Sequence, residues 1–185
     1  MPYEFTENYA GYSDWHWQRL FAPLKGLPDL RAVEIGSYEG SSAVWFLDNV
    51  LTHESCRLVC IDPWGPDAES REPVFDRNVA SHPRGGQVEK RKGTGRHILP
   101  TLADGIFDFV YVDGSHEARD VLTDALLALP LLKPGGILLF DDYEWRDPLG
   151  QVNLPPRQGI NAFLDICASQ IVLEHREYQV VVRKK

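Results

Sequence analysis

The chain has 185 residues, a formal net charge of −8 at pH 7, and 43% hydrophobic and 25% charged residues. This balance is typical of folded proteins and argues against a disordered chain, and the length suits a single domain spanning residues 1–185. The negative charge disfavours contact with nucleic-acid phosphates or anionic membrane surfaces. We therefore expect a small-molecule partner, with no nucleic acid and no membrane.

The cysteines and the N-terminal residues give the expected compartment. Cys56, Cys60 and Cys167 are odd in number and follow no spacing pattern, so neither a disulfide framework nor a zinc site is predicted. Free thiols suit a reducing compartment. The sequence contains no signal-peptide pattern and no apolar run near the ~20 residues of a membrane span. These features predict a cytoplasmic protein.

Strand and helix patterns alternate along the chain. In order, they predict a strand at 31–35, a helix at 41–51, a strand at 57–61, a helix at 72–80, a strand at 87–91, a short helix at 95–102, a strand at 107–112, a helix at 117–129, a turn at 133–136, a strand at 137–140, a loop at 146–156, a helix at 160–169, and strands at 171–174 and 179–183. The last two strands should pair antiparallel because their connection is too short for a crossover.

This order predicts an α/β fold with a Rossmann-like, doubly wound sheet. The sheet would have seven mostly parallel strands and an antiparallel final strand, with ligands at the carboxyl ends of the strands. Residues 31–185 would form the catalytic core. Residues 1–30 hold an aromatic segment that either packs on the core or a dimer partner, or closes over the substrate as a lid. Its members are Tyr12, Trp15, His16 and Trp17.

A glycine-containing loop follows the first predicted strand. Gly36 permits a tight turn and a close approach to a ligand, and Gly40 opens a helix whose N–H groups can face a carboxylate. A dinucleotide fingerprint, G-x-G-x-x-G, would place a glycine where Tyr38 stands. The loop therefore disfavours NAD and suits a cofactor without a pyrophosphate.

An acid and an aromatic residue follow the second predicted strand. Asp62 is placed to bind ribose hydroxyls, although an aspartate before a proline is also a common turn residue. Trp64 either stacks on an adenine or covers the end of the strand. Both alternatives stay open for Trp64, whereas the glycine loop favours the ribose role for Asp62.

Five segments occur in an order that resembles a known family. They are residues 33–36, 61–62, 107–116, 132–136 and 140–143. Together they resemble class I S-adenosylmethionine-dependent methyltransferases, most closely small bacterial O-methyltransferases of the macrocin and cephalosporin-biosynthesis type, over residues 31–183. The resemblance implies S-adenosylmethionine as the cofactor. It implies cofactor contacts from Glu34, Gly36, Ser37, Tyr38, Gly40 and Ser42 around the methionine, from Asp62 at the ribose, from Thr94 and Gly95 beside the adenine, and from Trp64 and Asp113.

Three aspartates follow the next two strands of the predicted sheet. Asp113 ends one strand, and Asp141 and Asp142 end its neighbour, about 4.8 Å away in a parallel sheet. Carboxylates this close repel one another unless a cation lies between them, and Mg²⁺ or another divalent cation prefers such ligands. The alternative is that they are solvated turn or cap residues.

His116 stands three residues after Asp113, where catechol-type methyltransferases place a general-base lysine. Histidine titrates near neutrality and can accept a hydroxyl proton, although a solvated helix-start residue is the alternative. The resulting prediction is metal-assisted O-methylation of a small hydroxylated acceptor (a natural product, a sugar or a catechol-like molecule), with His116 and Asp113 as catalytic residues.

Two other functions stay open, an NAD-type oxidoreductase and a non-catalytic cofactor-binding module. Because little chain is left for a substrate domain, either the acceptor is small or a second subunit of a homo-oligomer completes the pocket. The histidines without motif context are expected at the surface. They are His53, His82, His97 and His175.

Overall fold

A computed structural model describes residues 3–7, 9–65, 71–147, 149–150 and 152–185. Its strands are β1 Arg31–Ile35, β2 Arg57–Asp62, β3 Val88–Lys92, β4 Phe107–Val112, β5 Leu132–Phe140, β6 Ile171–Arg176 and β7 Val180–Lys184. Its α-helices are α1 Tyr9–Leu20, α2 Ser41–Asn49, α3 Glu72–Ser81, α4 Gly95–Ile98, α5 Ala118–Leu131 and α6 Pro156–Ile166. Short 3-10 turns cover Gly85–Gln87 and Leu99–Thr101.

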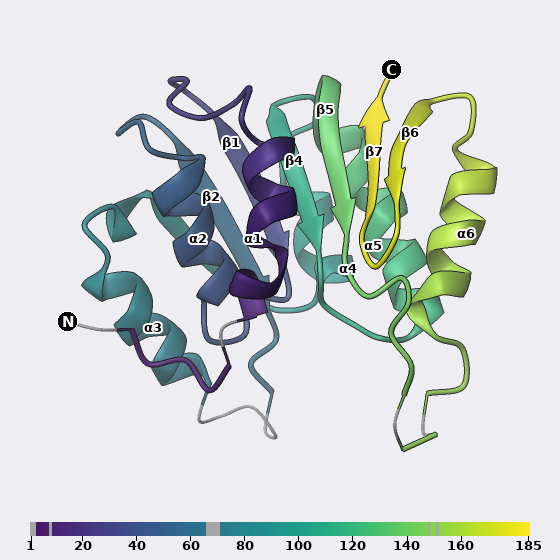
Figure 1. Ribbon diagram of the computed structural model, residues 1–185, viewed down its shortest axis with the longest axis horizontal. Coiled ribbons are helices and arrows are strands. Elements are labelled where there is room, and N and C mark those ends of the chain that lie inside the picture. The colour runs from purple at the N-terminus through teal and green to yellow at the C-terminus, as the bar shows by residue number, and fades with distance from the viewer. Residues whose placement is uncertain (1–2, 8, 66–70, 148, 151) are drawn as a thin grey trace.

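The strands form one seven-stranded sheet in the order β3-β2-β1-β4-β5-β7-β6. The pairs from β3 to β5 are parallel, whereas β7 runs antiparallel to both β5 and β6 (Figure 1). This confirms the predicted fold class. The chain reverses its direction of travel across the sheet between β1 and β4, and ligand crevices form at such a switch point.

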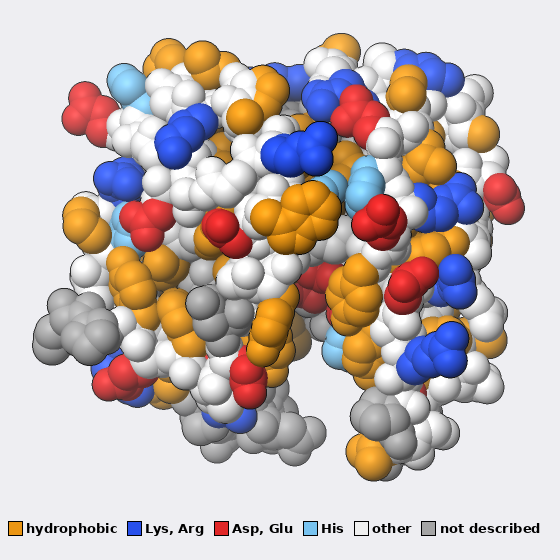
Figure 2. Space-filling model, viewed as in Figure 1, with side chains coloured by type: hydrophobic (Ala, Val, Ile, Leu, Met, Phe, Trp, Pro, Cys, Tyr) orange, Lys and Arg blue, Asp and Glu red, His pale blue; other side chains and the backbone are white. Residues whose placement is uncertain are grey.

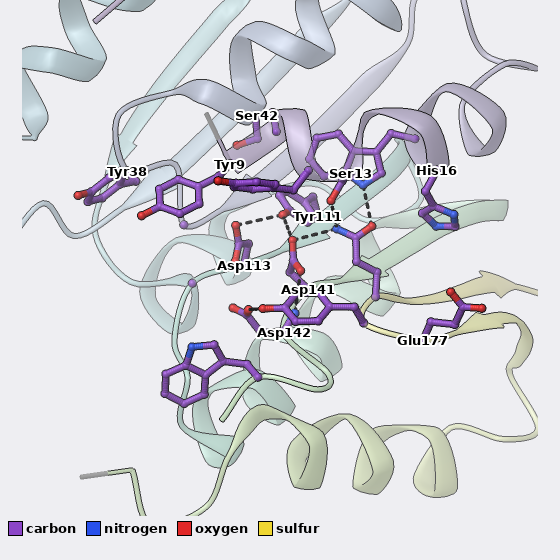
Figure 3. Close-up of a pocket in the computed structure, with 18 of the residues that line it drawn as sticks. Tyr9, Ser13, His16, Tyr38, Ser42, Tyr111, Asp113, Asp141, Asp142 and Glu177 are labelled. Carbon is purple, nitrogen blue, oxygen red and sulfur yellow. Dashed lines mark hydrogen bonds between the residues drawn. The ribbon is translucent and has the colours of Figure 1, made fainter. Parts of the chain in front are cut away.

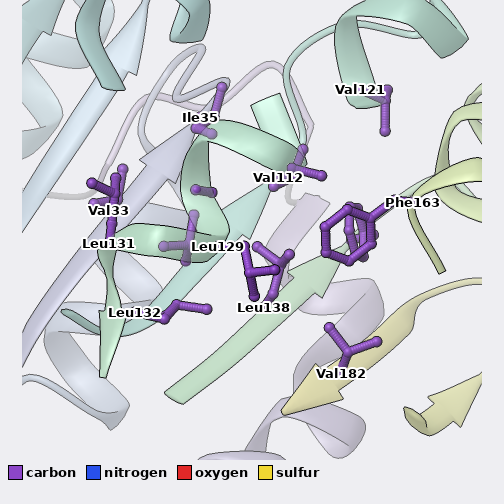
Figure 4. Packing of buried hydrophobic residues seen from close by; sticks show 14 of the residues in the cluster. Val33, Ile35, Val112, Val121, Leu129, Leu131, Leu132, Leu138, Phe163 and Val182 are labelled. Atoms are coloured by element: carbon purple, nitrogen blue, oxygen red, sulfur yellow. The ribbon is translucent and has the colours of Figure 1, made fainter. Parts of the chain in front are cut away.

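Side chains alternate between the two faces of each strand, and each face has its own core. Val110 and Val112 of β4 lie in a cluster with residues of α5 and α6, which Figure 4 shows. Phe109 and Tyr111 of the same strand lie in the other cluster, with residues of α1, α2 and α3. The sheet is therefore buried on both sides, as continuous apolar runs such as β4 predict.

The predicted turn at 133–136 is wrong. Strand β5 begins at Leu132, which pairs with Phe107, and the register shifts before Phe109 pairs with Ile137. Gly135 has a φ of 80°, so the Lys-Pro-Gly-Gly stretch forms an irregularity within the strand rather than a turn before it. The predicted loop at 146–156 is confirmed up to residue 155, apart from positions 148 and 151, which lie outside the described residues.

The aromatic segment folds as helix α1. Trp17 is buried against Phe46 and Tyr111, whereas Tyr12 and Trp15 are 74% and 62% exposed. One side of the helix therefore packs on the core. The lid or dimer role of the exposed side stays a prediction. In the part of the chain that the structure describes, no helix has the length and apolar character to span a membrane.

Candidate functional site

The loop after β1 is fixed by contacts that only glycine permits. Gly36 has a φ of 93°, and a Cβ there would lie 2.0 Å from the carbonyl oxygen of Asp113. Its N–H donates to the Ile61 carbonyl at 2.8 Å. The loops after β1, β2 and β4 are thus packed backbone to backbone.

Asp62 joins two of these loops. Its Oδ2 accepts a hydrogen bond from the Tyr38 N–H at 2.9 Å, and its Oδ1 accepts one from the Trp64 N–H at 2.7 Å. Tyr38 and Trp64 both have positive φ, 45° and 38°, a strained conformation for side chains of this size. Each carboxylate oxygen keeps a further acceptor position, so Asp62 can still accept hydrogen bonds from a ligand.

Trp64 lies beneath the loop rather than in a cavity. It is 1% exposed, packs against Phe75 with ring centroids 4.9 Å apart, and donates from Nε1 to the Tyr38 carbonyl at 2.9 Å. Trp64 lines neither of the cavities below. This favours the alternative in which the indole covers the strand end over the one in which it stacks on an adenine.

Two cavities open at the carboxyl ends of the parallel strands, with volumes of about 780 Å³ and 390 Å³. Both are lined by Gly36, Asp62 and Gly114, so they meet at the switch point. Figure 2 shows the molecule hollowed at this lower edge, with hydrophobic and acidic side chains along the walls. An elongated ligand could lie across both cavities.

The structure brings most of the predicted site residues to these cavities. The larger one is lined by Gly36, Tyr38, Ser42, Asp62, Asp113, His116, Asp141 and Asp142, and the smaller one by Gly36, Asp62, Thr94 and Gly95. Glu34, Ser37, Gly40 and Trp64 line neither. Gly40 instead caps α2 with a φ of 85° and lies against Phe75.

Glu34 is buried behind the glycine loop. Its carboxylate oxygens and the Ser37 hydroxyl are shielded from solvent and make no hydrogen bond of good geometry among the described residues, although Ser37, Ser42 and Cys60 lie close enough to stabilise the charged carboxylate. Burial raises the pKa of Glu34. Because Glu34 and Ser37 line neither cavity, the cofactor contacts predicted for them stay predictions.

The smaller cavity has an acid in its wall. Asp124 of α5 is 7% exposed, and a Cβ on Gly95 would lie 2.3 Å from its Oδ1. Burial, with a further contribution from the charge of Asp120, raises the pKa of Asp124 to about 6. The absence of a side chain at Gly95 therefore makes room for this carboxyl group.

A tyrosine hydroxyl bridges two of the three aspartates (Figure 3). The Tyr111 hydroxyl lies 3.0 Å from Asp113 Oδ2 and also contacts Asp141 Oδ2. Burial, and then the charge of Asp141, raises the pKa of Asp113, and burial raises the pKa of Asp141. One hydroxyl hydrogen cannot serve two carboxylates at once, so the trio is most stable when it holds an additional proton.

Asp142 contacts His116. The His116 Nε2 lies 2.9 Å from Asp142 Oδ2, and the Tyr178 hydroxyl donates to Asp142 Oδ1 at 2.9 Å. The Trp145 ring stacks on the imidazole at 4.3 Å and 11°. The hydrogen bond to Asp142 raises the pKa of His116, against a smaller opposing effect of burial. A carboxylate that holds one ring nitrogen leaves the other, Nδ1, to act as a base.

Asp141 and Asp142 make hydrogen bonds within the chain through both of their carboxylate oxygens. Asp141 Oδ1 accepts from the Asp142 N–H and Asp141 Oδ2 accepts from Gln179, while both oxygens of Asp142 are already hydrogen-bonded. Among the described residues, no group of three or more His, Cys, Asp or Glu side chains is placed to hold a metal ion. The magnesium site therefore stays a prediction from the sequence.

Several residues of the larger cavity were not predicted. Gln179 is 5% exposed and bonds Asp141, and the hydroxyl of Tyr111 sits between two predicted acids. Tyr111 could have been found, because it lies two positions before Asp113 on the same face of β4. His82 is 4% exposed and contacts Asp48, so its predicted surface placement is wrong, whereas His175 is partly exposed and lines the larger cavity.

The switch point, the glycine loop and the joined cavities define a doubly wound domain with an open ligand site at the carboxyl ends of its strands. A family model described as a methyltransferase domain matches residues 33–143. Because this is more than half of the chain, the protein belongs to that family of methyltransferase domains. Family and fold together identify a class I methyltransferase domain, as the sequence resemblance predicted.

The chain is also similar to individual proteins. An uncharacterized protein of Acanthamoeba polyphaga mimivirus is 32% identical over 122 residues, which is 63% of this chain and 52% of that protein. The chain thus spans about half the length of this curated relative.

Two solved structures share the fold. The O-methyltransferase TomG of Streptomyces achromogenes, solved with SAM, is 23% identical over 84% of this chain and 73% of its own, with a TM-score of 0.66. An O-methyltransferase of Bacillus cereus, solved with SAH, is 17% identical over 100% of this chain and 84% of its own, with a TM-score of 0.70.

Proposed function

We propose that the protein binds S-adenosylmethionine across the two cavities and transfers its methyl group to a hydroxyl of a small molecule. The observation that carries the proposal is the meeting of the cavities at Gly36, Asp62 and Gly114. The nucleoside would occupy the smaller cavity and the methionine part the larger one, with Asp62 at the ribose between them. Relatives of this fold were solved with SAM or SAH, which supports the choice of cofactor.

The residues of the larger cavity suit the chemistry. S-adenosylmethionine, when bound, supplies an activated methyl group on a sulfonium. The chain's task is then to align an acceptor oxygen with that methyl group and to take up the proton that the hydroxyl releases. His116 Nδ1 would accept this proton while Asp142 holds Nε2 and orients the ring.

The residues at the floor of the larger cavity would orient the bound cofactor. Tyr111, Asp113 and Asp141 form a hydrogen-bonded unit next to Gly36 and Gly114. Their carboxyl groups favour a cationic centre nearby, which a sulfonium provides. These roles of the carboxyl groups do not depend on a divalent metal.

Calorimetric titration with SAH tests the proposal. We expect one site per chain, with an affinity unchanged by EDTA because the cofactor contacts proposed here require no metal. Asp62→Ala should weaken binding by about tenfold or more, since it removes a charged hydrogen-bond acceptor. Asp104→Ala, at an exposed turn, is the matched control. Absence of SAH binding by the folded wild-type protein would contradict the proposal.

A further inference from the structure

The end of the larger cavity that lies farthest from the glycine loop is built by two separate elements. Helix α1 contributes His16, and the β6–β7 hairpin contributes His175 and Glu177. The two imidazole rings lie 4.4 Å apart, and His175 Nε2 lies 3.9 Å from Glu177 Oε2. Figure 3 shows His16 and Glu177 on the opposite side of the aspartates from Tyr38.

The His16 side chain lines this end of the cavity and is partly buried. Its Nε2 is shielded from solvent and has no partner among the described residues. Burial, followed by the nearby His175, lowers the pKa of His16 against an opposing effect of Glu177, and Arg19 lowers it further. The ring is therefore neutral near pH 7, and in the tautomer that carries its hydrogen on Nδ1 the Nε2 atom accepts a hydrogen bond. A buried polar atom without a partner is unfavourable until a ligand or water satisfies it.

Acidic side chains outnumber basic ones among the described residues that line the larger cavity. Among the described residues that line it there is no lysine or arginine, whereas Asp113, Asp141, Asp142 and Glu177 all contribute carboxyl groups. Aromatic rings stand at the same end, with Trp15 edge-on to His16 at 5.8 Å. Carboxylates and aromatic faces both attract cations, and carboxylates repel anions.

We propose that His16, His175 and Glu177 form a subsite for a protonated amine at the non-reacting end of the methyl acceptor. The inference rests on the proposed function, since it takes the aspartate end of the cavity as the place of methyl transfer. The ammonium would donate to His16 Nε2 and pair with the Glu177 carboxylate. Acceptors that carry a carboxylate or phosphate at this end would be rejected.

Three phenols of the same shape test the charge of the acceptor. They are para-hydroxyphenethylamine, para-ethylphenol and para-hydroxyphenylacetate, titrated calorimetrically into the SAH-saturated protein with EDTA present. We expect the amine to bind roughly tenfold or more tighter than the acid, with the neutral phenol between them. Added salt should reduce the difference, because the charges at this end are partly exposed.

Two test variants and one control variant locate the effect. Glu177→Gln should reduce amine affinity by about threefold to fivefold, the size expected of a charge this exposed, and leave the neutral phenol unchanged. Glu174→Gln removes the same charge from β6 at a residue that pairs with Arg183 outside the cavity, so it should change nothing. His16→Phe keeps a ring beside His175 and should also weaken amine binding.

The outcomes separate this inference from the proposed function. Failure of SAH binding would count against the function. SAH binding together with equal affinities for amine and acid would overturn the subsite, as would an amine that does not bind at millimolar concentration. An amine preference that Glu177→Gln leaves intact would also overturn it.

Discussion

Gln179 donates a hydrogen bond from Nε2 to Asp141 Oδ2 at 2.9 Å, the same oxygen that contacts the Tyr111 hydroxyl. The amide also donates to Ser13 Oγ at 3.1 Å, and its Oε1 accepts from Trp17 Nε1 at 2.9 Å. One buried side chain immediately before β7 therefore links helix α1 to Asp141 at the sheet edge.

Replacing this amide should loosen α1. Gln179→Leu leaves the Trp17 indole N–H without its partner and removes a donor to Asp141, so we expect a loss of about 2 kcal/mol in the free energy of unfolding, measured by urea denaturation. Gln158→Leu, at an exposed position of α6, should stay within about 0.5 kcal/mol of the wild type. Equal effects of the two substitutions would contradict the role given to Gln179.

Substituting alanine at Gly36 and at Gly105 distinguishes the cost of a strained backbone from the cost of a steric clash. Both have positive φ, 93° and 67°, but a Cβ on Gly36 would meet the Asp113 carbonyl at 2.0 Å, whereas nothing lies within 4 Å of one on Gly105. Gly105→Ala should destabilise the protein by about 1 kcal/mol and leave SAH binding intact. Gly36→Ala should cost about 3 kcal/mol or more and abolish SAH binding, because the loops must move apart. Chemical denaturation and calorimetry measure the two effects.

The Tyr111 hydroxyl bridges two half-buried acids, Asp113 and Asp141. Tyr111→Phe leaves Asp113 and Asp141 facing each other without the bridging hydrogen bond, so we expect a loss of about 1–2 kcal/mol in unfolding free energy. Tyr178→Phe removes a hydroxyl that bonds Asp142 at the surface, where water can replace it, and should cost less than about 0.5 kcal/mol. If both variants lose the same stability, the bridge is not a stabilising element.

Asp124 should make stability depend on pH. Its pKa in the folded protein is about 6, above the ordinary value near 3.8, so the folded state holds its proton more tightly than the unfolded state. Stability from this group is therefore present below about pH 4 and is lost as the pH rises through about 6, by roughly 3 kcal/mol in total.

The variant Asp124→Asn isolates this effect, because an amide does not ionise. Urea denaturation from about pH 4 to about pH 7 should show the wild type losing stability relative to Asp124→Asn as the pH rises. A difference between the two proteins that stays constant over this interval would show that Asp124 titrates normally.

The sequence predicts most of the fold because its signals are local. The apolar run of β4 and the helical stripe of α2 are both found within a residue or two of their predicted ends. The start of β5 is missed because Pro134 and Gly135 resemble a turn, while the pairing of Leu132 with Phe107 depends on a distant strand. Tertiary pairing overrides local turn preference there.

The residues of the candidate site also fall into those that the sequence predicts and those that it does not. Residues at the ends of parallel strands, such as Asp62 and Asp113, are predictable because the fold carries them to one edge. His175 and Gln179 reach the same cavity through a hairpin that returns against the sheet, and no local pattern marks their destination. Trp64 is the opposite case, a residue that the sequence suggests for the site but the structure buries. Its position two residues after Asp62 suggests ligand contact, whereas its side chain is 1% exposed.

The antiparallel direction of β7 has an evolutionary consequence. Its first residues lie at the edge where the parallel strands end, so the short turn between β6 and β7 faces the same cavity as the loops after β1 and β2 (Figure 1). The cofactor loops and this turn are far apart in the chain, and their sequences can diverge independently. Substitutions confined to the β6–β7 turn would therefore change which acceptor is bound, while the loops after β1 and β2 that contact the cofactor stay the same.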